Sequence, residues 1–285
     1  MIKEWIAEYK PTNEEETLSA MREIMQEIAL AGLSRTDFFE KAAFYGGTAL
    51  RIFYNLDRFS EDLDFSLMEK NPNFSLEPYF TAIVTEFEAI GMKVSIREKD
   101  KKIKTSVESA FLKSETIWKE LILEDIVKQA GIQSNKNIKI KIEVDVKPPL
   151  SFKTEEKLLL RPFSFYVKCF TRSNLFAGKM HAILYRAWKG RIKGRDWYDL
   201  IWYIQNGVPL GLRYLEACMY QAKNLAANQV LDRAILLGML KTKIAGIDWE
   251  DAKADVRTFI ADPERLEIWS SHFFLDLIDH LQTET

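Results

Sequence analysis

The sequence predicts an α+β protein, with a mixed β-sheet domain flanked by helices over residues 1–170 and a helical domain over residues 171–285. Residues 139–147 alternate apolar and charged side chains, which is typical of a strand with one buried face. After about residue 172 the apolar residues recur with a helical period almost without interruption. The length of 285 residues is sufficient for one large domain or two ordinary ones.

The chain is predicted to begin with helices. Residues 13–33 carry acids in their first turn and apolar residues at helical spacing, which indicates an amphipathic helix. A short helix is expected at 36–41, with Thr36 as its N-cap. The apolar run 42–45 is expected to be a strand, and residues 48–54 are expected to be helical.

The next elements alternate in type. Residues 63–67 alternate and indicate a strand. A helix is predicted at about 76–90, ended by Gly91, and then a strand at 92–98. Residues 101–113 are ambiguous between strand and helix. The helical second half is predicted to contain helices at 174–188, 196–205, 212–226, 230–244, 249–260 and 264–281.

The composition excludes several classes of protein. The two cysteines, Cys169 and Cys218, cannot form a disulfide framework, and no His or second Cys lies at metal-ligand spacing. The chain has no run of about 18 uncharged apolar residues, so a transmembrane helix is not expected. The first residues lack the apolar core of a signal peptide. We therefore expect a reduced, cytoplasmic protein with no structural zinc and no membrane partner.

The net charge of −2 conceals a strong asymmetry. Residues 1–40 carry nine acids and four bases, whereas ten bases and no acid lie between Lys157 and Arg195. Such a basic run could attract phosphate, although a solvated basic face is the alternative. Aromatic side chains lie among the bases, and they are more simply interpreted as core than as surfaces that stack on nucleic-acid bases.

Asp62-Leu63-Asp64 is the first candidate site. On a strand, positions i and i+2 point to the same face, so the carboxylates of Asp62 and Asp64 would emerge side by side. Carboxylates held that close repel each other unless a cation neutralises them. Magnesium takes oxygen ligands and commonly uses one or two carboxylates together with substrate phosphates. An Asp-x-Asp sequence is common, and a solvated strand end is the alternative.

Gly46-Gly47-Thr48 lies between a predicted strand and a predicted helix. Two glycines let the backbone approach a ligand closely, and the free N–H groups at a helix start favour phosphate. Thr48 adds a hydroxyl donor. A plain tight turn is the alternative. A glycine loop, a short helix and an Asp-x-Asp strand within about twenty residues are more specific together than any of them alone.

Two separated motifs carry a resemblance to a known family. Residues 46–51 and 58–65 resemble the first motif of the AbiEii/AbiGii toxin family, a type IV toxin–antitoxin family of DNA polymerase β-like nucleotidyltransferases. Residues 175–182 and 194–200 resemble its second motif, a helical lysine followed by Arg-Asp-x-x-Asp-Leu. The resemblance covers roughly residues 40–205 and implies a nucleotidyltransferase-like sheet domain.

The first motif accounts for metal and phosphate binding. In phosphoryl-type transfer the catalyst mainly positions the reactants and neutralises developing charge. Asp62 and Asp64 are expected to hold the Mg²⁺ that bridges the triphosphate. The Gly46, Gly47 and Thr48 loop, with Ser60, is expected to grip the β and γ phosphates of the NTP.

The second motif supplies charged groups from the helical domain. Lys179 is expected to contact the triphosphate as a mobile point charge. Asp196 and Asp199 share a helix face and follow Arg195. These acids could orient Lys179, contact the nucleotide or act near the acceptor hydroxyl, and Arg195 is expected to help bind the nucleotide. A favourable charge placement at a helix start is the alternative for the acids.

The superfamily usually has a third carboxylate on a later strand, where it acts as metal ligand or general base. Asp145 is the candidate for this role and Glu143 is the reserve, because both lie on the polar face of the strand at 139–147. An ordinary exposed face with cross-strand pairing is the alternative.

The resemblance implies an enzyme that transfers nucleotides from an NTP to an RNA acceptor, in some relatives the 3′ end of tRNA. It also implies an antitoxin encoded alongside and a role in phage defence or growth control. The basic run suits an RNA acceptor because phosphate contacts dominate such affinity. The alternatives are a protein of the same fold that binds NTP or RNA without transfer, and a transferase that modifies protein hydroxyls.

Overall fold

The protein has a mixed secondary structure, seen in a computed structural model that describes residues 1–97, 116–123, 138–186, 192–226 and 229–285. Strands and helices both occur up to residue 170, and helices predominate after it. The predicted α+β class is confirmed. The ambiguous segment 101–113 and the end of the predicted helix 174–188 lie outside the described residues.

Seven strands of the described residues form one sheet. They are β1 (Ala42–Tyr45), β2 (Asp62–Leu67), β3 (Val94–Arg97), β4 (Thr116–Leu123), β5 (Ile138–Asp145), β6 (Thr154–Leu159) and β7 (Phe165–Phe170). Their order across the sheet is β3-β4-β5-β2-β1-β7-β6. The central pair β1–β2 is antiparallel, whereas β2–β5 and β1–β7 are parallel. The sheet is therefore mixed, as the sequence predicts.

The strands differ in how clearly the sequence marks them. Strand β5 follows the predicted alternation, and Ile140, Ile142 and Val144 are fully buried. Strands β4, β6 and β7 are not among the predicted elements. Strand β6 lies at the sheet edge with the sequence Thr-Glu-Glu-Lys-Leu-Leu, so it shows no apolar alternation, and its pairing with β7 stabilises it.

Helices α1 (Ile2–Glu8), α2 (Glu14–Ser34), α3 (Phe38–Lys41), α4 (Gly46–Tyr54) and α5 (Glu77–Ala89) accompany the sheet. Helix α2 begins as predicted, because the Asn13 side chain accepts a hydrogen bond from the Glu16 N–H at 2.9 Å. Helix α4 begins at Gly46, two residues before the predicted start. It ends at Asn55, whose φ of 59° is the left-handed conformation common at helix ends.

The second part contains α7 (Arg172–Tyr185), α8 (Gly194–Gln205), α9 (Leu212–Gln221), α10 (Arg233–Ala245), α11 (Trp249–Val256) and α12 (Ser271–Asp279). Short strands β8 (Leu210–Gly211) and β9 (Thr283–Glu284) pair in parallel. The helix predicted at 264–281 is wrong in its first part, where 3₁₀ turn η2 (Pro263–Leu266) replaces it. Helix α12 starts later because the Ser270 hydroxyl caps the Phe273 N–H.

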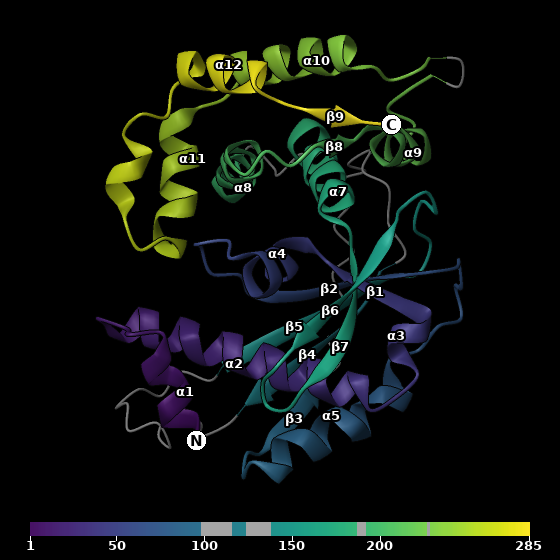
Figure 1. Cartoon of the computed structure of the whole chain (residues 1–285), viewed down its shortest axis with the longest axis vertical. Helices are drawn as coiled ribbons and strands as arrows, with labels where there is room; N and C mark the ends of the chain where they lie inside the picture. Colours follow the sequence, from purple (N-terminus) through teal and green to yellow (C-terminus); the bar gives the residue numbers. More distant parts are fainter. Residues whose placement is uncertain (98–115, 124–137, 187–191, 227–228) are drawn as a thin grey trace, which may run out of the picture.

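The two parts stack on each other. Helices α7 to α12 lie together at one end of the molecule, the sheet lies at the other, and α4 lies between them (Figure 1). Phe170 of β7 stacks on Tyr45 with ring centroids 5.2 Å apart and meets Tyr214 of α9 edge-on at 5.7 Å. One buried apolar core therefore runs from the sheet into the helices.

The described residues bear on two expectations from the sequence, which concern the two cysteines and the absence of a membrane-spanning helix. Cys169 and Cys218 are both free and buried, in agreement with the expectation that they form no disulfide. Among the described helices, none has the length and apolar character needed to cross a membrane.

Candidate active site

The junction of β1 and α4 has a backbone shape that requires glycine. Gly46 has a φ of 85°, a conformation that L side chains rarely adopt. A Cβ atom at this position would collide with the Asp64 carboxylate, and one at Gly47 would lie 2.9 Å from Arg58 Nη2. The glycines therefore let charged side chains approach the backbone directly. They also form the first turn of α4, where N–H groups without helical partners favour an anion.

Thr48 is the third residue of the predicted phosphate loop. Its side chain is fully buried, and its hydroxyl donates a hydrogen bond to the backbone carbonyl of Asp62. The hydroxyl is thus engaged within the protein. This bond fixes the first turn of α4 to the start of β2. Ser60 remains beside the loop, since its Oγ would lie 3.0 Å from a Cβ at Gly47.

The carboxylates of Asp62 and Asp64 lie on one face of β2, as the strand period predicts. Burial raises the pKa of both groups, and the negative charge of Glu143 raises them further. With the charge of Asp62 added, the pKa of Asp64 reaches about 7. These buried acids repel one another, and a bound cation would relieve that repulsion.

The register of β2 with β5 decides which later carboxylate lies near the pair. Asp64 is paired with Glu143, whereas Asp145 is paired with Ser66. One Asp145 oxygen accepts a hydrogen bond from the Lys147 N–H at 2.9 Å. Glu143 and not Asp145 therefore lies beside Asp64, an arrangement that follows from the parallel register of β5 and could not be read from the alternation alone. Glu143 itself forms an ion pair with Lys141.

The described residues contain no group of three or more His, Cys, Asp or Glu side chains that could hold a metal ion. The repulsion among buried acids at Asp62 and Asp64 nevertheless fits a cation. Magnesium commonly takes one or two protein carboxylates and completes its shell with water and substrate phosphates. The Asp62 and Asp64 carboxylates therefore fit the protein's share of such a set of ligands.

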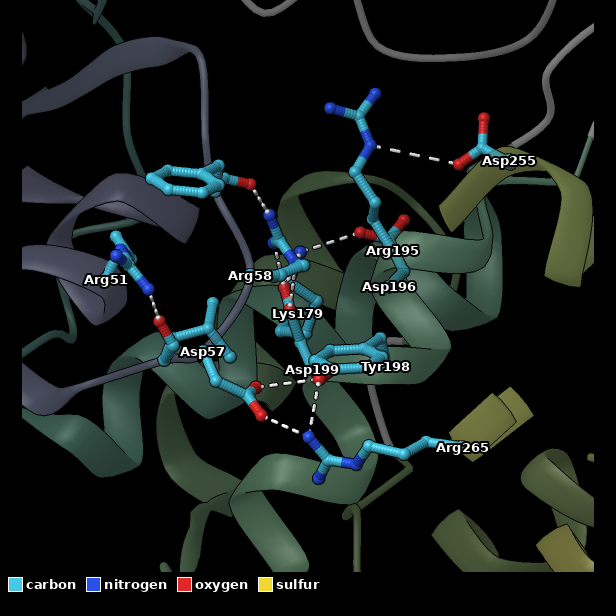
Figure 2. A network of polar contacts seen from close by, with 12 residues as sticks. Arg51, Asp57, Arg58, Lys179, Arg195, Asp196, Tyr198, Asp199, Asp255 and Arg265 are labelled. Carbon is cyan, nitrogen blue, oxygen red and sulfur yellow. Dashed lines mark hydrogen bonds and ion pairs between the residues drawn. The ribbon is translucent and has the colours of Figure 1, made fainter. Parts of the chain in front are cut away.

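Lys179 of α7 is held by the two acids of α8. Its Nζ lies 2.7 Å from Asp196 Oδ1 and 2.8 Å from Asp199 Oδ2 (Figure 2). Burial would raise the pKa of Asp196, but the charges of Lys179 and Arg186 outweigh burial and lower that pKa. The sequence predicted that these acids could orient Lys179, and their contacts are of that kind.

Asp199 is completely buried, and Arg58 forms a bidentate ion pair with it at 2.6 and 2.7 Å. Burial would raise the pKa of Asp199, but the charges of Arg58 and Lys179 hold it below its usual range. Both carboxylate oxygens are thus engaged within the protein. The side chain of Asp199 has no exposed surface.

Arg186 and Lys193 were not among the predicted site residues. Both lie close enough to Asp64 for their charges to lower its pKa. Burial, together with the neighbouring charges of Arg186 and Lys179, lowers the pKa of Lys193 to about 8. Two cations of the helical part therefore lie within electrostatic reach of an acid of the sheet. The acid-free run between Lys157 and Arg195 was the available signal, but it did not single out these two positions.

Other members of the basic run are engaged elsewhere. Arg195 pairs with Glu61 at 3.4 Å and with Asp255 at 3.8 Å, and its guanidinium lies 3.9 Å from the centroid of the Phe259 ring. Lys157 pairs with Glu155 at 3.0 Å. The run is therefore not one solvated face, because several of its charges are matched by acids from other elements.

Comparison with known proteins shows which family and which solved structures the chain is similar to. The family model described as nucleotidyl transferase AbiEii toxin, type IV toxin–antitoxin system, matches residues 28–273. MenT4, a nucleotidyltransferase toxin from Mycobacterium tuberculosis, is 14% identical with a TM-score of 0.54, over 98% of this chain and 88% of that one. JHP933 from Helicobacter pylori is 18% identical with a TM-score of 0.49, over 92% and 90%. A search of curated proteins finds no significant sequence match.

A glycine turn at the start of α4 lies beside paired carboxylates on the neighbouring strand β2, and the class of protein is a nucleotidyltransferase. Since the family model covers most of the chain, the protein belongs to the AbiEii family of nucleotidyltransferase toxins.

Replacing Gly46 by Ala should disturb both stability and chemistry. We expect the free energy of unfolding to fall by about 1–3 kcal/mol because φ is positive there, and we expect nucleotide transfer to fall because the new Cβ displaces Asp64. Gly91→Ala is the matched control, because Gly91 has a φ of 77° but nothing within 4 Å. Equal transfer by the two variants would contradict the role of the Gly46–Asp64 contact.

Asp64→Asn should stabilise the metal-free protein in a pH-dependent way. The pKa of Asp64 is raised from 3.8 to about 7, so the folded state holds a proton that the unfolded state releases. Stability from this group is present at low pH and is lost as pH rises toward 7. Denaturation with chelator should show the variant more stable by about 1–3 kcal/mol at pH 8 and little changed at pH 4. A pH-independent gain would contradict this origin.

Proposed function

We propose that this chain is a magnesium-dependent toxin that transfers a nucleotide from an NTP to an RNA acceptor, with tRNA as the acceptor. The observation that carries the proposal is the separation of charge across the site. Acids of the sheet, at Asp62 and Asp64, lie within electrostatic reach of cations from the helices, at Arg186 and Lys193. A metal ion suits the first group and a triphosphate suits the second.

The sheet residues provide the metal side. Asp62 and Asp64 are proposed to hold Mg²⁺, which would neutralise the phosphates and polarise the attacked phosphorus when bound. We assign the third carboxylate to Glu143, supported by its register opposite Asp64. Gly46 and Gly47 would present backbone N–H groups at the start of α4 to the phosphates.

The helical residues provide the phosphate side. Lys179 is proposed to contact the triphosphate, with its ammonium positioned by Asp196 and Asp199. Arg186 and Lys193 are added to this group for their closeness to Asp196. We propose further that residues 1–170 and 171–285 act as two domains that enclose the nucleotide between them.

The RNA acceptor is proposed from the positive charge of the surface, and the antitoxin partner is proposed from the family. Arg172 is an exposed base at the start of α7 and is a candidate for contact with acceptor phosphates. The type IV toxin–antitoxin family supports an antitoxin encoded alongside this chain. A cytoplasmic location is proposed from the same family, because tRNA and NTP are cytoplasmic.

Asp62→Ala and Asp64→Ala should each reduce transfer of a labelled nucleotide to total tRNA by at least about 100-fold, since each removes a metal ligand. The protein is incubated with each NTP, Mg²⁺ and tRNA, and the fold is checked by circular dichroism and thermal unfolding. Asp276→Ala, at an exposed position of α12, is the control. Full activity in either site variant would overturn the proposal. Label appearing on protein instead of RNA would redirect it to protein hydroxyls.

The third carboxylate can be tested by comparing two neighbours on one strand. Glu143→Gln should lower kcat for transfer much more than Asp145→Asn, by about 10-fold or more, because β5 places Glu143 beside Asp64. The two variants are compared at saturating NTP and Mg²⁺. A larger loss from Asp145→Asn would return the role to that residue.

A further inference from the structure

Arg58 joins three parts of the site that lie far apart in the sequence. It lies in the loop before β2, and its side chain is 3% exposed. Its guanidinium holds both oxygens of Asp199 on α8 and also donates to the Phe59 carbonyl at 2.9 Å. The same group lies under the glycine turn, 2.9 Å from where a Cβ of Gly47 would be. One buried cation thus lies beside the glycine turn and pairs with Asp199, the acid that also holds Lys179. Figure 2 shows Arg58, Asp199 and Lys179 together.

The charge balance around Asp199 explains why this matters. Asp199 Oδ2 accepts from Arg58 Nη2 at 2.7 Å and pairs with Lys179 Nζ at 2.8 Å. A buried carboxylate requires close cationic compensation. Without Arg58, Asp199 would depend more strongly on Lys179 for that compensation. The ammonium would then be drawn toward Asp199 and away from a triphosphate.

We propose that Arg58 is a positioning residue, which neutralises Asp199 from the sheet side so that Lys179 is directed at the NTP phosphates. This inference rests on the proposed function, because it assumes that Lys179 contacts the triphosphate. It goes beyond that function in giving the loop before β2 control over a cation of the helical part. Arg58 itself touches no substrate in this role.

A merely structural ion pair would have a different signature, and the chain offers a matched one. Arg161, in the turn between β6 and β7, forms a bidentate pair with Glu27 of α2. These side chains are 19% and 6% exposed, and they lie on elements outside the proposed site. Arg161→Met with Glu27→Gln therefore removes a largely buried pair without touching the Lys179 network.

The experiment compares variants by Tm, by kcat and KM for transfer, and by NTP affinity in calorimetry with Mg²⁺. Arg58→Met should lower Tm and reduce kcat/KM on the order of 100-fold, with NTP affinity weakened about 10-fold. Arg58→Lys should recover only part of the affinity. It restores the positive charge, but one ammonium cannot span both oxygens of Asp199. Arg58→Met combined with Asp199→Asn removes the uncompensated charge and should recover Tm together with part of kcat/KM and NTP affinity, because Lys179 is then no longer drawn toward Asp199.

The outcomes separate this inference from the proposed function. A combined Arg58 and Asp199 variant that recovers Tm but neither kcat/KM nor NTP affinity would overturn the positioning role, as would an equal loss of affinity in the Arg161 and Glu27 variant. Absence of transfer by the wild-type protein would instead overturn the proposed function. The calorimetric affinities still test Arg58 in that case, and an Arg58→Met variant that binds NTP as the wild type does would overturn the inference.

Discussion

The site depends on a separation of charge that backbone hydrogen bonds hold in place against repulsion. The parallel register of β2 and β5 puts Asp64 beside Glu143, two residues from Asp62, and burial then raises the pKa of Asp64 to about 7. The ladder between the strands leaves these acids no freedom to move apart. Positive charge nearby stabilises such a group of carboxylates, and the helical part supplies it from α7 and the start of α8.

The cations are in turn held by buried acids of their own. Asp196 and Asp199 both form ion pairs with Lys179 and thereby fix its position. Arg58, in the loop before β2, also pairs with Asp199 and compensates its charge. The two parts of the fold are consequently joined by ion pairs as well as by the aromatic contacts of Phe170. The network ties the glycine turn at the start of α4 to the charged residues of α7 and α8. Packing and chemistry then depend on the same residues.

The site residues that could be predicted from the sequence are those whose positions follow from their immediate neighbours along the chain. Gly46 and Gly47 mark a backbone turn, and the i, i+2 spacing of Asp62 and Asp64 is sufficient to put them on one strand face. Which of Glu143 and Asp145 lies beside Asp64 depends on the register between β2 and β5. The alternation of residues within one strand does not reveal that register. Edge strand β6 escaped notice because its stability comes from β7 and not from its own pattern.

By itself, the sequence determined the α+β class, the glycine turn, the Asp-x-Asp pair and the order of the two motifs, because each follows from spacing along a few residues or from resemblance. Tertiary structure alone decided that Thr48 and Asp199 turn inward, that Arg58 meets Asp199, and that Arg186 and Lys193 face Asp64. Except for the contact between Thr48 and Asp62, these interactions join residues more than a hundred positions apart, and burial and charge balance at those distances depend on how β2, α7 and α8 pack together.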